Sequence, residues 1–176
     1  MMIADPAFDA AIAAVLAHEG SYQCAREDAG NWTGGKVGVG ELKGTKYGIS
    51  AASYPDLDIV ELSEDQAREI YARDWWQRLG LAQLPPDVSA KLLDAAVNIG
   101  ATAAFTALQR ALRASGESVV EDGRLGPETI AAVAETPAEK LLPALREALA
   151  GHYRLIAVAH PNLESQLKGW LARAYS

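Results

Sequence analysis

The chain has 176 residues, enough for one globular domain that buries roughly 70% of the surface exposed by its unfolded form. Its composition is 49% hydrophobic and rich in alanine and leucine, which favours packed helices over sheet. The net charge of −7, with lysines and arginines scattered singly, argues against nucleic acid as a partner, and the single cysteine, Cys24, excludes an internal disulfide.

The beginning of the chain lacks the features of an export signal. Residues 1–16 have no basic start and contain Asp5 and Asp9. No apolar run approaches the roughly 20 residues that a membrane span needs. We therefore expect synthesis in the cytoplasm without a cleavable signal peptide or integral membrane segment, so action outside requires a separate export route.

The first predicted element is a helix that begins at Asp5 and Pro6, a capping residue followed by proline at the first helical position. One face of this helix is apolar, at Phe8, Ile12, Val15 and Leu16. We expect the helix to end near Glu19 and Gly20.

A glycine-rich segment follows at residues 21–50. Glycine recurs at seven positions, which disrupts helical periodicity and indicates turns and short hairpins. These glycines are Gly30, Gly34, Gly35, Gly38, Gly40, Gly44 and Gly48. The segment predicts a small loop or β-hairpin lobe.

Two helices are predicted next. Residues 63–66 form a capping box that opens a helix carrying Trp75 and Trp76. A strongly apolar helix then spans about 87–99 and is closed by Gly100. Such a helix, apolar on almost every side, suits the centre of a bundle.

The rest of the chain also reads as helical. A helix at about 102–114 precedes turn residues at 122–128. Residues 136–139 form a second capping box for a helix that runs to about residue 159, and a last helix covers about 163–175. We therefore predict a mainly α fold, a helical bundle around the central apolar helix with a small glycine-rich lobe.

Glu19 is a candidate general acid. At the C-terminus of a helix, unsatisfied carbonyls and the negative end of the dipole disfavour a further negative charge, so a carboxyl there tends to keep its proton. A proton held near neutral pH is what protonation of a glycosidic oxygen requires. Position alone also fits a solvated glutamate at the end of a surface helix, and favours that interpretation.

A glycosidase usually needs a second carboxylate, and Glu27, Asp28 and Glu41 lie in the glycine-rich segment. We favour Asp28, although it also fits a turn residue that binds its own backbone before Gly30. In an inverting enzyme the two carboxyl groups stand about 6.5–9.5 Å apart, a span that a loop folding back on a helix end can provide.

Aromatic residues of the same segment, Tyr22, Trp32 and Tyr47, are of the kind that stacks on sugar rings; ordinary packing is the alternative for each. The three histidines show no metal-ligand spacing, and the glycines match no nucleotide-binding loop. We expect neither a metal nor another cofactor.

Seven motifs, in order along the chain, resemble those of a known family. They lie at residues 18–22, 44–50, 70–76, 94–100, 108–112, 122–129 and 168–173. The first four resemble glycoside hydrolase family 108, N-acetylmuramidases of the lysozyme-like superfamily found among phage endolysins and secretion activators. The last three resemble the peptidoglycan-binding segment that accompanies this catalytic module.

The resemblance implies roles for particular residues. The family's catalytic glutamate lies in a Glu-Gly-Gly-Tyr motif, matched by Glu19 with Ser21 in place of the second glycine, and this reverses the preference from position alone. The order of glutamate, aspartate and threonine is also similar to the triad of phage-type lysozymes, which implies Asp28 with either Thr33 or Thr45. Thr45 is favoured because it lies in the motif at 44–50.

The resemblance also implies a partner and a division of the chain. Residues 1–90 would form the catalytic part and 91–176 a peptidoglycan-binding-like part packed onto it, with Asn98 among the substrate-binding residues. The expected partner is the glycan strand of peptidoglycan, cleaved in the periplasm or at the cell wall by a monomer that a holin or another route exports. A lytic transglycosylase and a non-catalytic wall-binding module are the alternatives.

Overall fold

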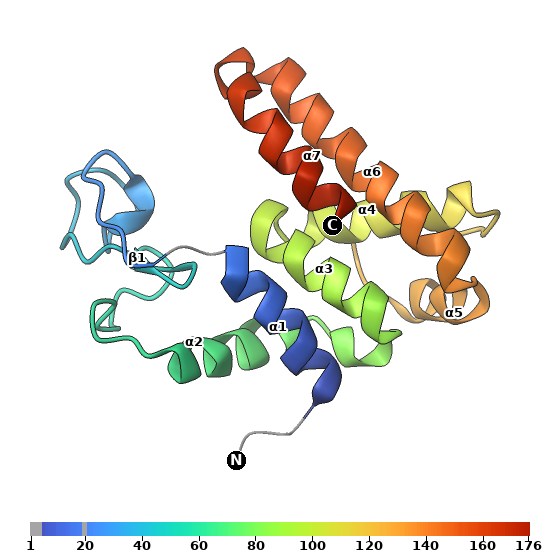
Figure 1. Ribbon diagram of the computed structural model, residues 1–176, viewed down its shortest axis with the longest axis horizontal. Helices are drawn as coiled ribbons and strands as arrows, with labels where there is room; N and C mark the ends of the chain where they lie inside the picture. Colours follow the sequence, from blue (N-terminus) through green and yellow to red (C-terminus); the bar gives the residue numbers. More distant parts are fainter. Residues whose placement is uncertain (1–4, 19–20) are drawn as a thin grey trace. The chain divides into compact units, whose positions relative to one another are not determined.

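The computed structural model describes residues 5–18 and 21–176 (Figure 1). Close contacts group the chain into two units, Met1–Asp74 and Trp75–Ser176. In the described part of the chain, no helix combines the length and the apolarity that crossing a membrane requires.

Helix α1, Pro6–His18, opens the first unit. Its N-cap is the predicted one: Oδ1 of Asp5 accepts hydrogen bonds from the backbone N–H groups of Ala7 at 3.0 Å and Phe8 at 3.3 Å. The apolar face of α1 is buried at Phe8, Ala11, Ile12 and Val15. The spacing of these residues is that of one helical stripe.

The glycine-rich segment contains only short elements. A 3-10 turn, η1, spans Ala29–Asn31, and strands β1, Thr45–Lys46, and β2, Ile49–Ser50, form a two-stranded antiparallel sheet. The pairing joins Thr45 with Ser50 and Lys46 with Ile49, so the connecting turn has two residues. The predicted loop and hairpin lobe is confirmed.

Helix α2, Glu64–Tyr71, starts at Ser63, where both reciprocal hydrogen bonds of the predicted capping box are present. The tryptophan pair does not continue this α-helix as expected. From Ala72 to Gln77 the backbone widens into the π-helical stretch η2. An ion pair between Arg68 and Asp9 joins α2 to α1.

The second unit is helical, which confirms the predicted mainly α fold. Its elements are η3 (Leu81–Gln83), α3 (Pro86–Ile99), α4 (Ala101–Ala114), α5 (Pro127–Glu135), α6 (Ala138–Ala159), η4 (Pro161–Gln166) and α7 (Leu167–Tyr175). Helix α3 packs against α4 and α6, and α6 also packs against α4 and α7 (Figure 1). Leucines fill the centre, at Leu92, Leu93, Leu108, Leu112, Leu141, Leu145 and Leu149.

The second predicted capping box, at 136–139, is wrong. The hydroxyl of Thr136 donates to the carbonyl of Ala132 at 2.7 Å, so it completes the end of α5 instead of starting α6. Helix α6 begins after Pro137 without a side-chain cap. The last helix also starts later than expected, because η4 occupies the beginning of the predicted range.

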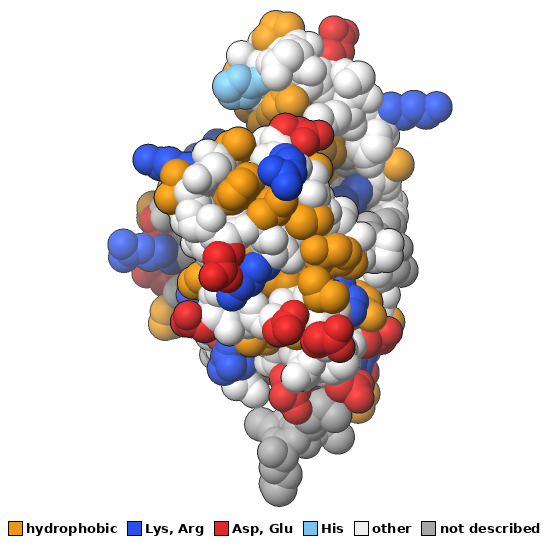
Figure 2. Space-filling view, turned by 90° about the vertical axis from the view of Figure 1, so that its left-hand side faces the viewer, with side chains coloured by type: hydrophobic (Ala, Val, Ile, Leu, Met, Phe, Trp, Pro, Cys, Tyr) orange, Lys and Arg blue, Asp and Glu red, His pale blue; other side chains and the backbone are white. Residues whose placement is uncertain are grey.

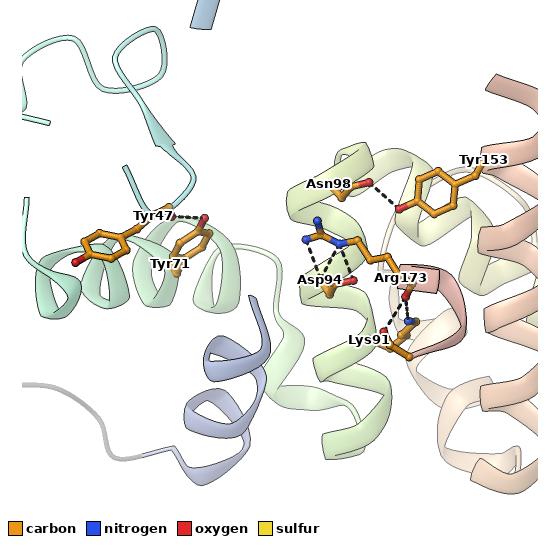
Figure 3. A network of polar contacts seen from close by, with 8 residues as sticks. Tyr47, Tyr71, Lys91, Asp94, Asn98, Tyr153 and Arg173 are labelled. Atoms are coloured by element: carbon orange, nitrogen blue, oxygen red, sulfur yellow. Dashed lines mark hydrogen bonds and ion pairs between the residues drawn. The ribbon is translucent and has the colours of Figure 1, made fainter. Parts of the chain in front are cut away.

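Within the second unit, charged side chains fasten α7 to α3 (Figure 3). The guanidinium of Arg173 binds the carboxylate of Asp94 through Nε at 2.9 Å and Nη2 at 2.8 Å, with both side chains about 15% exposed. Lys91 donates from Nζ to the carbonyl of Arg173 at 2.6 Å. Burial lowers the pKa of Lys91, and the nearby Asp94 partly offsets this effect.

Candidate active site

Glu19, the predicted general acid, lies outside the described residues, which resume at Ser21. The candidate site is therefore built from the segment that follows it in the chain. This segment contains most of the other residues that the sequence proposes.

The centre of the segment is the side chain of Asn31, which is completely buried. Its Nδ2 donates to Oε1 of Gln23 at 2.8 Å and to the carbonyl of Ala25 at 2.9 Å. Its Oδ1 accepts from Nε2 of Gln23 at 3.1 Å and from the hydroxyl of Thr45 at 2.8 Å. Both donors and both lone pairs of the carboxamide are thus used, which fixes its orientation.

Backbone hydrogen bonds around Asn31 also hold together Gln23, Asn31 and Thr45, which we call the Asn31 assembly. Its carbonyl accepts hydrogen bonds from the N–H groups of Lys43 and Gly44, and Gln23 and Thr45 exchange two backbone bonds of 2.9 Å. Gly44 has φ +85°, and a Cβ there would lie 2.5 Å from the carbonyl oxygen of Gln23. Only glycine allows the two chain segments to approach this closely.

Asp28 is an exposed carboxylate held at the edge of this assembly. Its Oδ1 accepts from the N–H of Gly30 at 2.9 Å and caps η1, while its Oδ2 accepts from Nε2 of Gln23 at 3.2 Å. Asp28 is therefore the turn residue of the alternative interpretation, and Gln23 also links it to Asn31 and Thr45.

The two other candidate carboxylates have different surroundings. Glu27 and Glu41 are both exposed, and Glu41 forms an ion pair of 3.6 Å with Lys43. Among the described residues, Asp28 is the carboxylate that a hydrogen bond, donated by Gln23, connects to the Asn31 assembly. The structure thus brings together Asp28 and Thr45, and leaves Glu27 and Glu41 outside.

The two candidate threonines have different hydrogen bonds. The hydroxyl of Thr45 donates its proton to Asn31. The hydroxyl of Thr33 accepts from the N–H of Glu41 at 2.9 Å, where it closes the 33–41 turn. In the described part of the chain no acceptor takes the proton of Thr33, so this hydroxyl can still donate to water or substrate.

The aromatic candidates Tyr22 and Trp32 differ in how firmly they are held. Tyr22 is 39% exposed, and a hydrogen bond with Cys24 raises its pKa above the ordinary value. Trp32 is half-buried, and its indole Nε1 donates to the carbonyl of Arg26 at 2.9 Å. Trp32 is thus part of the lobe's own packing, while Tyr22 presents more of its ring to solvent.

Tyr47 stands in the turn between β1 and β2 with φ +53°, a left-handed conformation that tyrosine rarely adopts. Its carbonyl accepts a hydrogen bond of 3.0 Å from the hydroxyl of Tyr71 (Figure 3). The Nζ of Lys46 lies 5.5 Å from the centre of its ring. Strained backbone of this kind is often retained where a side chain must face a ligand.

Asn98, the remaining candidate, lies near the C-terminus of α3 in the second unit. It is exposed, and its Oδ1 accepts a hydrogen bond of 2.7 Å from the hydroxyl of Tyr153 (Figure 3). Burial raises the pKa of Tyr153 to about 12. The structure gives Asn98 a role in joining α3 to α6.

Charges near the surface are mixed in sign. Figure 2 shows acidic and basic side chains interspersed with hydrophobic ones on the face that it views. Within residues 5–18 and 21–176, no three His, Cys, Asp or Glu side chains gather in a way that could hold a metal ion.

Sequence reasoning missed Gln23 and Asn31, although they organise the described part of the site. A buried asparagine cannot be distinguished by sequence from the many turn asparagines of a glycine-rich segment. A weak signal was available, since an amide side chain can pair with both a hydroxyl and a carboxylate.

Comparisons with known proteins agree with this architecture. A family model described as Glycosyl hydrolase 108 matches residues 12–100, and one described as Predicted Peptidoglycan domain matches residues 103–175. A solved structure described as that of Brucella abortus SagA is similar, with 25% identity and a TM-score of 0.66 over 96% of this chain and 94% of that chain. No curated protein matches. The two family matches support a glycoside hydrolase that degrades peptidoglycan; the division at residues 90 and 91 stays a prediction.

Proposed function

This chain belongs to the glycosyl hydrolase 108 family, and from this premise we propose that it is an N-acetylmuramidase, a lysozyme of the bacterial cell wall. Its reaction is hydrolysis of the β-1,4 linkage between N-acetylmuramic acid and N-acetylglucosamine. The peptidoglycan domain matched at residues 103–175 supports the choice of glycan. We place its action at the cell wall, in phage lysis or in secretion.

The observation that carries the proposal is the fixed Gln23–Asn31–Thr45 assembly, which holds Asp28 nine residues after Glu19. In the sequence Glu19 directly follows His18, the last residue of α1, and a carboxyl at the C-terminus of a helix is expected to keep its proton. In this mechanism Glu19 donates its proton to the leaving oxygen. Asp28 accepts a proton from water, or stabilises the developing positive charge on the sugar.

A threonine hydroxyl positions the water in this proposal. The motif at 44–50 favours Thr45, but its proton is committed to Asn31. Thr33 keeps a proton that can donate, so its hydrogen bonds suit contact with water better. We therefore assign Thr33 to the water and Thr45 to the support of Asp28.

Substrate contacts follow from exposure and hydrogen bonding. Tyr22 and Tyr47 offer rings for stacking on sugars, whereas Trp32 and Asn98 act more through the packing they maintain. Backbone amides of the glycine-rich segment can donate to N-acetyl groups, because glycine lets the chain approach a glycan closely.

The test is digestion of purified peptidoglycan by the parental enzyme and by Glu19→Gln. We expect the substitution to lower fragment release by roughly 100- to 10,000-fold, the usual contribution of a general acid. The matched control is Glu69→Gln, which changes an exposed glutamate of α2 and should retain parental activity. Parental activity in Glu19→Gln would exclude the assignment.

The chain ends of the products decide the reaction class. A hydrolase leaves a reducing N-acetylmuramic acid, whereas a lytic transglycosylase leaves a 1,6-anhydro end that is lighter by one water. Mass spectrometry should find the reducing end. Asp28→Asn should reduce the rate strongly, and Glu27→Gln and Glu41→Gln should not. Sedimentation with peptidoglycan but no fragment release by the parental chain would instead indicate a binding module.

A further inference from the structure

Helix α6 is apolar on two opposite faces, and only one of them packs into the core. Leu141, Leu145, Leu149 and Tyr153 are buried. On the other side, Leu155 is 64% exposed and Val158 is 79% exposed. A surface helix normally carries charged and polar residues on its outer face, so a second apolar stripe indicates an interaction surface.

This stripe is the wall of a groove with a volume of about 760 Å³. The small and apolar residues of α6 that line it are Ala144, Ala148, Gly151, Leu155 and Val158; α6 also contributes Glu147, His152 and Arg154, and α4 adds Arg110 and Ala114. The small and apolar residues of α6 follow one another in steps of four and three, the spacing of a helix–helix seam. A Cβ built at Gly151 would meet no atom within 4 Å, so another helix has room to approach.

Charges along the edge of the groove indicate which helix fits. Glu147 and Arg154 lie seven residues apart on the same edge, 64% and 50% exposed. They contact one another at 3.8 Å and share the hydroxyl of Tyr175. If a second α6 lies antiparallel across the groove, Glu147 of each copy faces Arg154 of the other, so the edge is complementary to itself.

We propose that two copies of this chain associate through the groove of α6, antiparallel about a two-fold axis near Gly151. A two-fold contact uses the same surface on both subunits, as this charge arrangement requires. Leu155 and Val158 of each copy cover the small residues of the other. The monomer that the sequence suggested is then the low-concentration form.

The expected dimer is weak. One helix–helix seam buries less than the roughly 1,200–2,000 Å² of a stable interface, which places the contact in the transient class. The dissociation constant should therefore lie in the micromolar range. The inference does not depend on the proposed hydrolysis, because it uses residues of α4, α6 and α7 and none of the candidate active site.

Analytical ultracentrifugation of the full chain tests the proposal through charge reversal. The parental mass should rise from 18.7 kDa towards twice that value as the concentration increases. Glu147→Arg alone and Arg154→Glu alone should each remain monomeric, because like charges then face one another. An equimolar mixture of these two variants should dimerise, since every facing pair is again of opposite charge.

The controls separate association from misfolding. Circular dichroism melting should show that both single variants fold, and Glu69→Arg, a reversal on the exposed face of α2, should dimerise like the parent. Leu155→Asp should abolish dimerisation. A parental chain that stays monomeric up to about 1 mM, or single variants that still dimerise, would overturn the proposal. A mixture that stays monomeric would do the same.

Discussion

The side chain of Asn31 determines the geometry of the candidate site more than any carboxylate described there. It makes four hydrogen bonds while fully buried, and two of its partners, Gln23 and Thr45, lead to the chemistry. A buried polar group of this kind stabilises the fold only while all of its partners are satisfied.

Asn31→Ala should therefore lower the free energy of unfolding by about 2–3 kcal/mol, because it removes all four hydrogen bonds of a buried carboxamide, those with Gln23, Ala25 and Thr45. Urea denaturation measures this loss. Asn162→Ala, at an exposed position of η4, is the control and should change stability by less than about 0.5 kcal/mol. Equal stability of the two variants would show that the assembly does not support the lobe.

The backbone of Tyr47 is strained, at a turn position where asparagine or glycine adopts the same conformation more easily. Two-residue hairpin turns with positive φ favour Asn followed by Gly, and this chain has Tyr followed by Gly. Local folding therefore does not account for the tyrosine, which supports the proposal that its ring binds sugar.

Tyr47→Asn should change the free energy of unfolding by less than about 1 kcal/mol, because relief of the strain offsets loss of the contact between Lys46 and the ring. The KM for peptidoglycan fragments should rise several-fold, while Tyr47→Phe keeps the parental KM. Enzyme kinetics and denaturation on the same samples separate these effects. An unchanged KM for Tyr47→Asn would show that the ring does not bind substrate.

At the residue scale, sequence alone finds groups whose chemistry is visible in their type. Asp28 and Thr45 were proposed as carboxylate and hydroxyl, and the structure links them. The link itself, through Gln23 and Asn31, could not be predicted because it depends on a chain reversal that brings residues 23, 31 and 45 together.

At the scale of elements, a capping motif in the sequence predicts a helix end reliably when only one helix is close enough to use it. Asp5 and Ser63 cap α1 and α2 as predicted. Thr136 does not cap α6, because it stands between two helices and its hydroxyl bonds to the end of α5. A capping residue that directly follows one helix and precedes another can thus bond to either helix end, and tertiary packing decides which.

Three helices of the second unit meet at Tyr153. Its hydroxyl donates from α6 to Asn98 of α3, and its ring stacks on Trp170 of α7 with centroids 5.6 Å apart. Burial raises its pKa from 10.0 to about 12, because the charged form is disfavoured away from water.

This shift predicts a loss of stability in alkali. Between about pH 10 and 12 the unfolded chain releases the proton of Tyr153 while the folded chain retains it, so the free energy of unfolding falls as pH rises. The slope from this group is at most about 1.4 kcal/mol per pH unit. Urea denaturation across this range should show a shallower slope for Tyr153→Phe, and Tyr175→Phe should keep the parental slope. Equal slopes in all three proteins would contradict the buried-tyrosine explanation.

For the whole molecule, the order of motifs predicted more than any single one. Short motifs from residue 18 to residue 173 resembled a catalytic segment followed by a peptidoglycan-binding one, and the family matches at 12–100 and 103–175 have the same order. Fold class was predictable because apolar periodicity and helix ends recur along the chain. Exposed apolar stripes such as that of α6 were not predictable, because the helical period of apolar residues does not distinguish a face that packs inside the protein from one that stays at the surface.

The net charge of −7 predicts how the enzyme meets its substrate. Cell walls that carry anionic polymers repel an acidic protein, and salt screens this repulsion as the Debye length falls from about 30 Å at 0.01 M to about 8 Å at 0.15 M. The rate on such walls at low substrate concentration should therefore rise several-fold over this range. Walls stripped of their anionic polymers should show a smaller rise. Glu128→Gln with Glu135→Gln changes two exposed acids and reduces the net charge to −5, so the double variant should be faster than the parent at 0.01 M and similar to it at 0.15 M. A parental rate that falls with added salt would mean that a local basic surface, and not the net charge, controls the encounter.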